Sequence, residues 1–390
     1  MKKRPLFVLF AAVFVDMIGF GIVLPLLPFY AESLGASPLE VTILFASFSG
    51  MQVIAAPLWG RVSDRQGRRP LLVAGLFASA VSYLIFGLAT SFWIILLSRV
   101  AAGAAGGTIS VAQAYIADST SGDERAAGMG HIGAASGLGV MVGPVIGGFF
   151  AEFGYGVPGF VAAGLCAANG LLAILFLPES WPKGRADGTR PEPLDLREWL
   201  RAFTRFPLSL LLGVYFLAIS SFTAMTAVLA LYMERAFDIG AREMGYLFTL
   251  AGLVTVVVRG ALLGTLVRAF GEPRVVRLGV VLLFAAMTFT PGMPTAFWAI
   301  LIMTLHAAGA GTLFPSLASL VSRATDEASQ GSILGGSQIV GGLGRVVGPL
   351  WAGLAFQGLG IRSPFFIGAA CLAAAWLLAL RVQLPEVVVR

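Results

Sequence analysis

Long apolar stretches alternate with short polar segments along the whole chain. Each stretch approaches or exceeds the roughly 20 residues that cross a bilayer as a helix, and none shows the two-residue alternation of membrane strands. The pattern predicts an all-α integral membrane protein with twelve transmembrane helices. The expected spans are 5–30, 40–60, 70–89, 92–117, 127–151, 157–177, 206–233, 243–267, 275–291, 296–322, 331–357 and 363–384.

The composition supports a membrane protein and excludes other classes. Hydrophobic residues make up 57% of the chain and charged residues 12%, with a mean hydropathy of +0.88. A soluble protein carries about 25% charged residues, and a disordered chain is poor in apolar ones. Two cysteines, Cys166 and Cys371, are too few for a disulfide scaffold, and we expect both to pack inside helices.

The basic residues predict the orientation of the chain. Twelve spans leave both termini on one side, and 20 of the 26 Lys and Arg residues fall in segments on that side, against three on the other. Cytoplasmic segments carry such an excess, so we expect cytoplasmic termini in the cell inner membrane. The net charge of +6 therefore reflects topology, and no nucleic-acid partner is expected.

The two halves of the chain repeat one another. The tripeptide at 142–144 recurs at 347–349, an offset of 205. Two six-helix halves in the same order are typical of large secondary transporters, whose substrate site lies between the halves. We expect an N-terminal bundle over 1–177, a cytoplasmic linker with an amphipathic helix within 178–205, and a C-terminal bundle over 206–390.

A charged loop follows the second span, from Gly60 to Pro70. Its glycines permit a tight reversal. Asp64 is a lone acid among arginines, and Asp118, at the end of the fourth span, lies on the same side and is placed to pair with Arg68. The loop is either an anchor that sets topology or a conformational latch.

Small residues recur in the fifth span. Their spacing allows another helix to approach closely, and a proline inside the span permits a bend. Plain helix packing explains the same pattern. The candidate packing or hinge residues, with their repeats in the eleventh span, are Gly139, Gly143, Pro144, Gly147, Gly348 and Pro349.

Ionisable groups inside the spans are the next candidates, because charges are costly there. Asp16, roughly 15 Å deep, is the only carboxylate near the middle of a span. Burial favours its neutral form and a nearby arginine its charged form. Arg99 lies at a similar depth in the antiparallel fourth span, so the two form either a proton-coupling pair or a structural ion pair. Arg345, in the eleventh span, contacts either substrate or backbone carbonyls.

Apolar walls with a few polar groups suit a lipophilic ligand. Any single residue of this kind more often packs or faces lipid, and His306 is expected to be a satisfied interior histidine. The candidate cavity residues are Gln52, Gln113, Tyr115, Phe222, Met225, Gln338 and Arg345. The sequence has no Lys-containing phosphate loop, no zinc-ligand spacing and no catalytic constellation, so we expect neither an enzyme nor a metal or cofactor.

The charged loop resembles the motif between the second and third helices of the major facilitator superfamily. Gly60, Asp64, Arg65, Gly67, Arg68 and Arg69 occupy its fixed positions. The resemblance implies that Asp64, Arg68 and Asp118 form a network that favours the outward-open state. The second copy, Gly264 to Arg274, keeps the glycines and has lost the Asp.

Two further motifs narrow the resemblance. The run Gly139 to Gly148 is similar to the motif of proton-coupled exporters, although 344–353 carries a similar run. Arg99 and Gly103 match the Arg-x-x-x-Gly setting of the drug-exporter branch, in which the arginine helps couple protonation to transport. The chain thus resembles the tetracycline-efflux-like group of twelve-helix drug:proton antiporters.

This resemblance implies export of small lipophilic or amphipathic compounds by alternating access. The proton gradient is the energy source, and no cofactor is needed. The expected partners are the substrate, protons and the lipid bilayer, with the chain as a monomer. One alternative is a lipid or amphiphile flippase or facilitator on the same fold without proton antiport. Another is a solute-sensing membrane protein.

Overall fold

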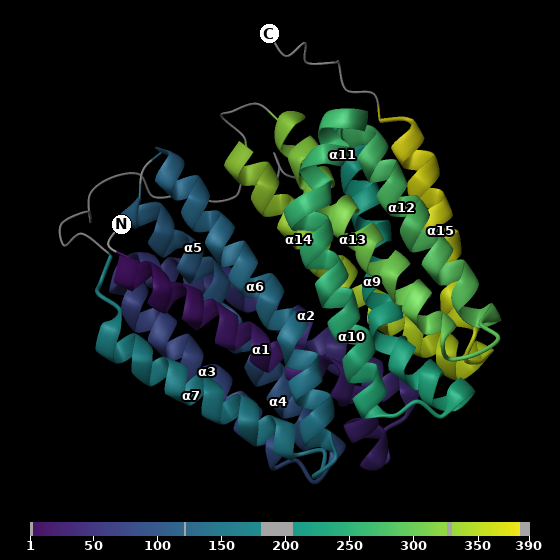
Figure 1. Ribbon diagram of the computed structural model, residues 1–390, viewed down its shortest axis with the longest axis horizontal. Coiled ribbons are helices and arrows are strands. Elements are labelled where there is room, and N and C mark those ends of the chain that lie inside the picture. The colour runs from purple at the N-terminus through teal and green to yellow at the C-terminus, as the bar shows by residue number, and fades with distance from the viewer. Residues whose placement is uncertain (1–2, 121, 181–205, 326–329, 383–390) are drawn as a thin grey trace. The chain divides into compact units, whose positions relative to one another are not determined.

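The computed structural model describes residues 3–120, 122–180, 206–325 and 330–382, which contain helices and no strand (Figure 1). The helices are α1 (Lys3–Ser33), α2 (Pro38–Gln66), α3 (Arg68–Gly87), α4 (Phe92–Ala105), α5 (Thr108–Ser119), α6 (Gly122–Ala151), α7 (Val157–Phe176), α9 (Leu208–Phe237), α10 (Ala241–Val257), η1 (Val258–Leu262), α11 (Leu263–Phe270), α12 (Glu272–Phe289), η2 (Thr290–Gly292), α13 (Trp298–Arg323), α14 (Gln330–Leu359) and α15 (Ser363–Leu380).

Twelve stretches of these described residues are long and apolar enough to cross a membrane. They confirm the expected spans to within a few residues at most ends. The fourth span, Phe92–Ser119, comprises α4 and α5, and the eighth, Ala241–Phe270, comprises α10, η1 and α11. The chain is therefore an all-α, multi-pass membrane protein.

The fourth span is interrupted at two glycines because α2 approaches it there. A Cβ atom on Gly106 would lie 3.0 Å from Gln52 Nε2, and one on Gly107 would lie 2.6 Å from Cγ of Trp59. The Trp59 indole N–H donates to the carbonyl of Ala104, the residue before the last of α4. Small residues at the break thus leave room for the side chains of α2.

Helix α2 extends further than the sequence pattern indicated. Its N-terminus carries a capping box, in which the Ser37 hydroxyl accepts from the Glu40 N–H and the Glu40 carboxylate accepts from the Ser37 N–H. Its last turns include Gly60 and Asp64, so the segment from Gly60 to Pro70, which the sequence predicts as a loop, is helical except at Gly67. The reversal is made by Gly67 alone, whose φ of +99° favours glycine.

The described residues divide into two compact units. Of the described residues, the first contains those up to 180 together with 229–253, and the second contains 206–228 together with those from 254 to 382. In the first, α1 packs against α6 and α7, and α3 packs against α7 and α4. Ion pairs of Arg235 with Glu32, at 2.7 Å, and of Arg242 with Glu152 also lie in this unit.

In the second unit, α12 packs against α13 and α15, which run beside it in Figure 1. The expected division into 1–177 and 206–390 stays a prediction. The expected amphipathic helix falls within 181–205 and so lies outside the described residues.

Candidate functional site

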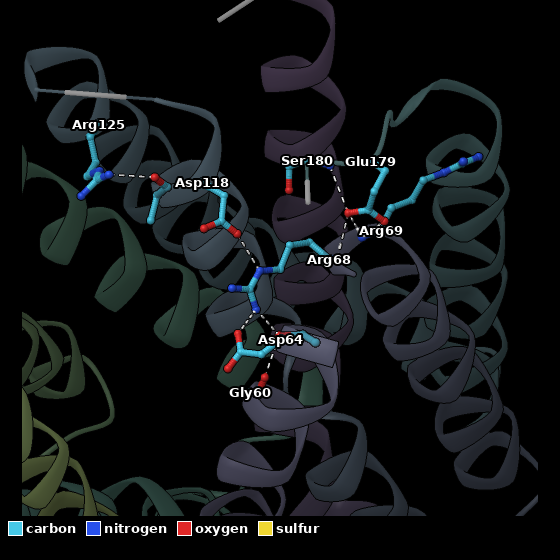
Figure 2. A network of polar contacts seen from close by, with 10 residues as sticks. Gly60, Asp64, Arg68, Arg69, Asp118, Arg125, Glu179 and Ser180 are labelled. Atoms are coloured by element: carbon cyan, nitrogen blue, oxygen red, sulfur yellow. Dashed lines mark hydrogen bonds and ion pairs between the residues drawn. The ribbon is translucent and has the colours of Figure 1, made fainter. Parts of the chain in front are cut away.

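A charge network joins three helices of the first unit around the guanidinium of Arg68 (Figure 2). Arg68 begins α3, and its side chain is 8% exposed. Its Nη1 atom lies 2.6 Å from Oδ1 of Asp64 on α2, and its Nε atom lies 2.8 Å from Oδ2 of Asp118 on α5. The structure thus brings together the three residues that the sequence predicted as a latch.

Glu179 belongs to the same region, and sequence reasoning missed it. Its carboxylate accepts hydrogen bonds from the backbone N–H groups of Arg68, at 3.0 Å, and Arg69, at 3.3 Å (Figure 2). It therefore caps the positive end of α3. A Cβ atom on Gly67 would lie 2.7 Å from Glu179 Oε2, so this contact is a second reason for glycine there. The only signal in the sequence was that residues 177–179 recur at 384–386.

The second unit holds a counterpart of this network with reversed charges. Glu272, at the start of α12, accepts from the Ser319 hydroxyl at 2.7 Å and pairs with Arg323 at 3.3 Å. At the repeat offsets of 204 and 205, Glu272 corresponds to Arg68 and Arg323 to Asp118, while Arg268 corresponds to Asp64. The second copy has lost the Asp that corresponds to Asp64, but it contains an ion pair in which the acidic and basic positions are exchanged. The repeat offsets already place these two residues at matching positions in the sequence.

Asp16 lies inside the first unit on α1 and is 6% exposed. The hydroxyls of Ser79 on α3 and Thr108 on α5 interact with its carboxyl group. Thr108 Oγ1 is enclosed and makes no hydrogen bond of regular geometry with a partner in the described chain. A carboxyl group buried among hydroxyls can exchange a proton without losing every polar neighbour.

Arg99, on α4, is 4% exposed and lies against aromatic rings rather than a carboxylate. Its guanidinium carbon is 4.9 Å from the ring centroid of Phe86 and 6.0 Å from that of Tyr83. Its Nε donates to Ser98 Oγ at 3.3 Å, and its Nη2 is enclosed without a partner among the described residues. No ion pair joins Arg99 to Asp16 in the described residues, which differs from the expected pairing.

Three glycines of the fifth span face α1, the helix that carries Asp16. A Cβ atom on Gly143 would lie 2.6 Å from the carbonyl oxygen of Ile18, and one on Gly147 would collide with the carbonyl oxygen of Ile22. Gly139 meets α1 in the same way, and Gly348 of α14 meets α9 at Ser220. Pro144 and Pro349 lie inside continuous helices. The close-packing role is therefore observed, and a hinge stays a prediction.

The predicted cavity residues are divided between the two units, with three in the first and four in the second. Tyr115 is buried, and its hydroxyl donates to the carbonyl of Pro178 at 2.8 Å, next to Glu179. Met225 is fully buried in α9. Gln113 and Gln338 are exposed, and Gln52 is partly buried.

Phe222 belongs to an aromatic cluster of the second unit. Its ring stacks on the imidazole of His306 at 4.6 Å with an interplanar angle of 3°, and meets Phe314 edge-on at 5.6 Å. His306 is buried, and its Nδ1 has no partner among the described residues. The expectation of a satisfied histidine was therefore wrong for this nitrogen. Arg345 likewise has an enclosed Nε without a partner in the described chain.

Comparison with known proteins places this arrangement in a family. The model of the Major Facilitator Superfamily matches residues 9–349 and 211–389. The chain is 28% identical to Multidrug resistance protein 2 of Bacillus subtilis (strain 168), covering 93% of this chain and 91% of that one. It is 30% identical to the class C Tetracycline resistance protein of Escherichia coli, covering 90% and 89%.

Solved structures of transporters have the same fold as this chain. The human organic anion transporter MFSD10 (TETRAN) superposes with a TM-score of 0.72 at 26% identity, covering 97% of this chain and 99% of that one. The nucleoside transporter NupG reaches 0.80 at 13% identity over 98% and 100%, which shows the shared fold. With family matches over nearly its whole length and twelve membrane-crossing stretches, the chain belongs to the Major Facilitator Superfamily and is a transporter, not an enzyme.

Proposed function

We propose that the protein is a proton-coupled exporter of small lipophilic or amphipathic compounds, drugs among them, which works by alternating access. The observation that carries the proposal is Asp16, a buried carboxyl group in the first span that no described cation pairs with. Burying a carboxylate without a counterion costs far more than burying a carboxylic acid. The structure therefore fits a protonated Asp16. The resistance proteins to which the chain is similar support the substrate class.

The proposed cycle uses two protonation states of Asp16. A proton taken up from outside neutralises the carboxyl group and favours substrate release, and its loss to the cytoplasm resets the transporter. Arg99, a buried cation on α4 of the same unit, stabilises the carboxylate when Asp16 is deprotonated. The network of Asp64, Arg68 and Asp118 stabilises the outward-open state. The proton gradient is the sole energy source, and the chain acts as a monomer in the cell inner membrane with cytoplasmic termini.

Proton flux in liposomes tests the proposal. The purified full chain is reconstituted under a pH gradient, and lipophilic cations, tetracycline-like compounds and anionic amphiphiles are added one at a time. We expect at least one compound to trigger proton movement that Asp16→Asn abolishes. Asp238→Asn is the matched control, because it makes the same exchange at an exposed position whose φ of +56° suits asparagine. Uphill transport that persists in Asp16→Asn would contradict the proton role of Asp16.

One observation favours a second candidate function, movement of an anionic amphiphile without antiport. Arg345 lies in the middle of α14, half-buried and with no ion-pair partner among the described residues, and a cation placed within a membrane span attracts an anionic group. The similar human structure is that of an organic anion transporter. Under this function, Arg345→Ala abolishes movement of an anionic lipid probe, whereas Asp16→Asn leaves it unchanged. If Asp16→Asn abolishes movement of the probe and Arg345→Ala leaves it unchanged, the second candidate function is wrong.

A further inference from the structure

Tyr83 lies against the face of α1 that carries Asp16, although nothing in its sequence context marked it. It is on α3, is 5% exposed, and its ring lies flush against the backbone of Gly19. A Cβ atom on Gly19 would lie 2.6 Å from Tyr83 Cε2 and 3.1 Å from its hydroxyl oxygen. Gly19 follows Asp16 by three residues, so both occupy one face of α1. Ser79, which interacts with Asp16, precedes Tyr83 by four residues on α3.

Tyr83 also contacts the guanidinium of Arg99. The guanidinium carbon lies 6.0 Å from the Tyr83 ring centroid, within the range of a cation–aromatic contact, and 4.9 Å from the Phe86 ring. Arg99 Nη2 has no hydrogen-bond partner among the described residues, so the aromatic faces supply much of its favourable environment. One tyrosine ring is therefore placed between the acid-bearing face of α1 and the buried cation of α4.

The groups around Tyr83 are few. Asp16 on α1, Arg99 on α4 and Cys166 on α7 interact with Tyr83 electrostatically. The effect of Asp16 on the Tyr83 hydroxyl is opposite to that of Arg99, because the two side chains carry opposite charges. From α5, the Thr108 hydroxyl interacts with Asp16. Tyr83 thus interacts with both members of the expected proton-coupling pair.

We propose that Tyr83 is a positioning residue whose ring holds Arg99 away from Asp16 while Asp16 is protonated, and whose displacement lets Arg99 reach the carboxylate once the proton has left. This inference rests on the proposed proton-coupled function. When Asp16 releases its proton to water, it gains a negative charge. The Asp16 carboxylate then attracts the Arg99 guanidinium more strongly than the aromatic faces do. On reprotonation the attraction is lost, and Arg99 returns to the rings.

The inference is tested on the protonation of Asp16 itself. Infrared difference spectra of the purified full chain contain the C=O band of the protonated Asp16 carboxyl group, identified by its loss in Asp16→Asn. This band is followed against pH in wild type, Tyr83→Phe and Tyr83→Leu. Tyr83→Phe keeps the ring, and we expect a curve within about 0.3 pH units of wild type. Tyr83→Leu removes the ring, so Arg99 can pair with Asp16, and the band should persist only to a pH about one unit lower, a tenfold change in proton affinity.

Two further variants separate positioning from a structural role. In an Arg99→Gln background, Tyr83→Leu should shift the curve no further, because the cation it positions is gone. Gly19→Ala pushes the ring without altering Tyr83, so it should shift the curve in the same direction. It also replaces Tyr83→Leu if that variant does not fold. Gly133→Ala, whose Cβ would meet nothing within 4 Å, is its control.

The outcomes distinguish this inference from the proposed function. A Tyr83→Leu curve that coincides with wild type, or that shifts equally without Arg99, overturns the role of Tyr83. If the band shifts as expected but no compound triggers proton movement in liposomes, the positioning role stands and the antiport proposal fails. If substrate triggers proton release and the band does not shift, antiport stands without Tyr83.

Discussion

Glu272 and Arg323 form an ion pair at the two positions where Arg68 and Asp118 form one in the first half of the chain, with the charges exchanged. In both copies the residue that begins the helix is the buried partner. Its side chain is 8% exposed at Arg68 and 9% exposed at Glu272. The repeat has therefore preserved a buried charge with a counterion, while its sign has reversed.

The exposed partner of the second pair should matter more to stability than the buried one. Arg323 is 59% exposed, so Glu272→Gln leaves an arginine that water solvates. Arg323→Gln instead leaves the buried Glu272 carboxylate with the Ser319 hydroxyl as its one described donor. The free energy of unfolding should then fall by about 1 kcal/mol, because water already screens the exposed Arg323 side of the pair. The Tm of the purified protein should thus fall further in Arg323→Gln. A larger loss in Glu272→Gln would contradict this.

The two motif glycines before α3 should respond differently to alanine. Gly67→Ala forces a side chain into a positive φ and against Glu179, and we expect a loss of about 1–2 kcal/mol. Gly60 lies inside α2, and a Cβ there would meet nothing within 4 Å. Gly60→Ala should be neutral or stabilising by up to about 1 kcal/mol. Thermal unfolding of both variants tests this, and equal losses would show that Gly60 has a contact absent from the structure.

The contact between α6 and α1 predicts a second glycine pair. Gly143→Ala places a methyl group against the Ile18 carbonyl, and the two helices must separate, at a cost of about 1–3 kcal/mol. Gly133→Ala, on the same helix, meets open space and is the control. Unfolding in detergent measures the difference. If Gly143→Ala were as stable as Gly133→Ala, the helices would be packed less tightly than described.

The stacking of His306 on Phe222 predicts that ring shape matters more than polarity. His306→Phe keeps the stack and removes the unpartnered Nδ1, so its stability should stay within about 1 kcal/mol of wild type. His306→Ala opens a cavity beside Phe222 and Phe314 and should cost about 3 kcal/mol. The Tm values of the two variants and of wild type measure this difference. A His306→Phe variant as unstable as His306→Ala would mean that Nδ1 has a partner.

Much of the candidate site could be predicted from the sequence. Asp64, Arg68 and Asp118 met as predicted, because a motif of fixed spacing lies beside the end of a neighbouring span. Gly139, Gly143 and Gly147 of the fifth span face a helix, as small residues at helical spacing predict. Glu179 and Tyr83 were missed, since their importance depends on partners more than 60 residues away or on another helix.

The sequence by itself determined the fold class, the twelve spans and the internal repeat. These follow from the length and periodicity of apolar runs, which the bilayer imposes on each helix separately. Only the tertiary structure decided that Arg99 lies on aromatic rings instead of Asp16, and that Glu272 pairs with Arg323. Depth along a span is set by residue count, whereas the direction and partner of a side chain are set by the packing of neighbouring helices.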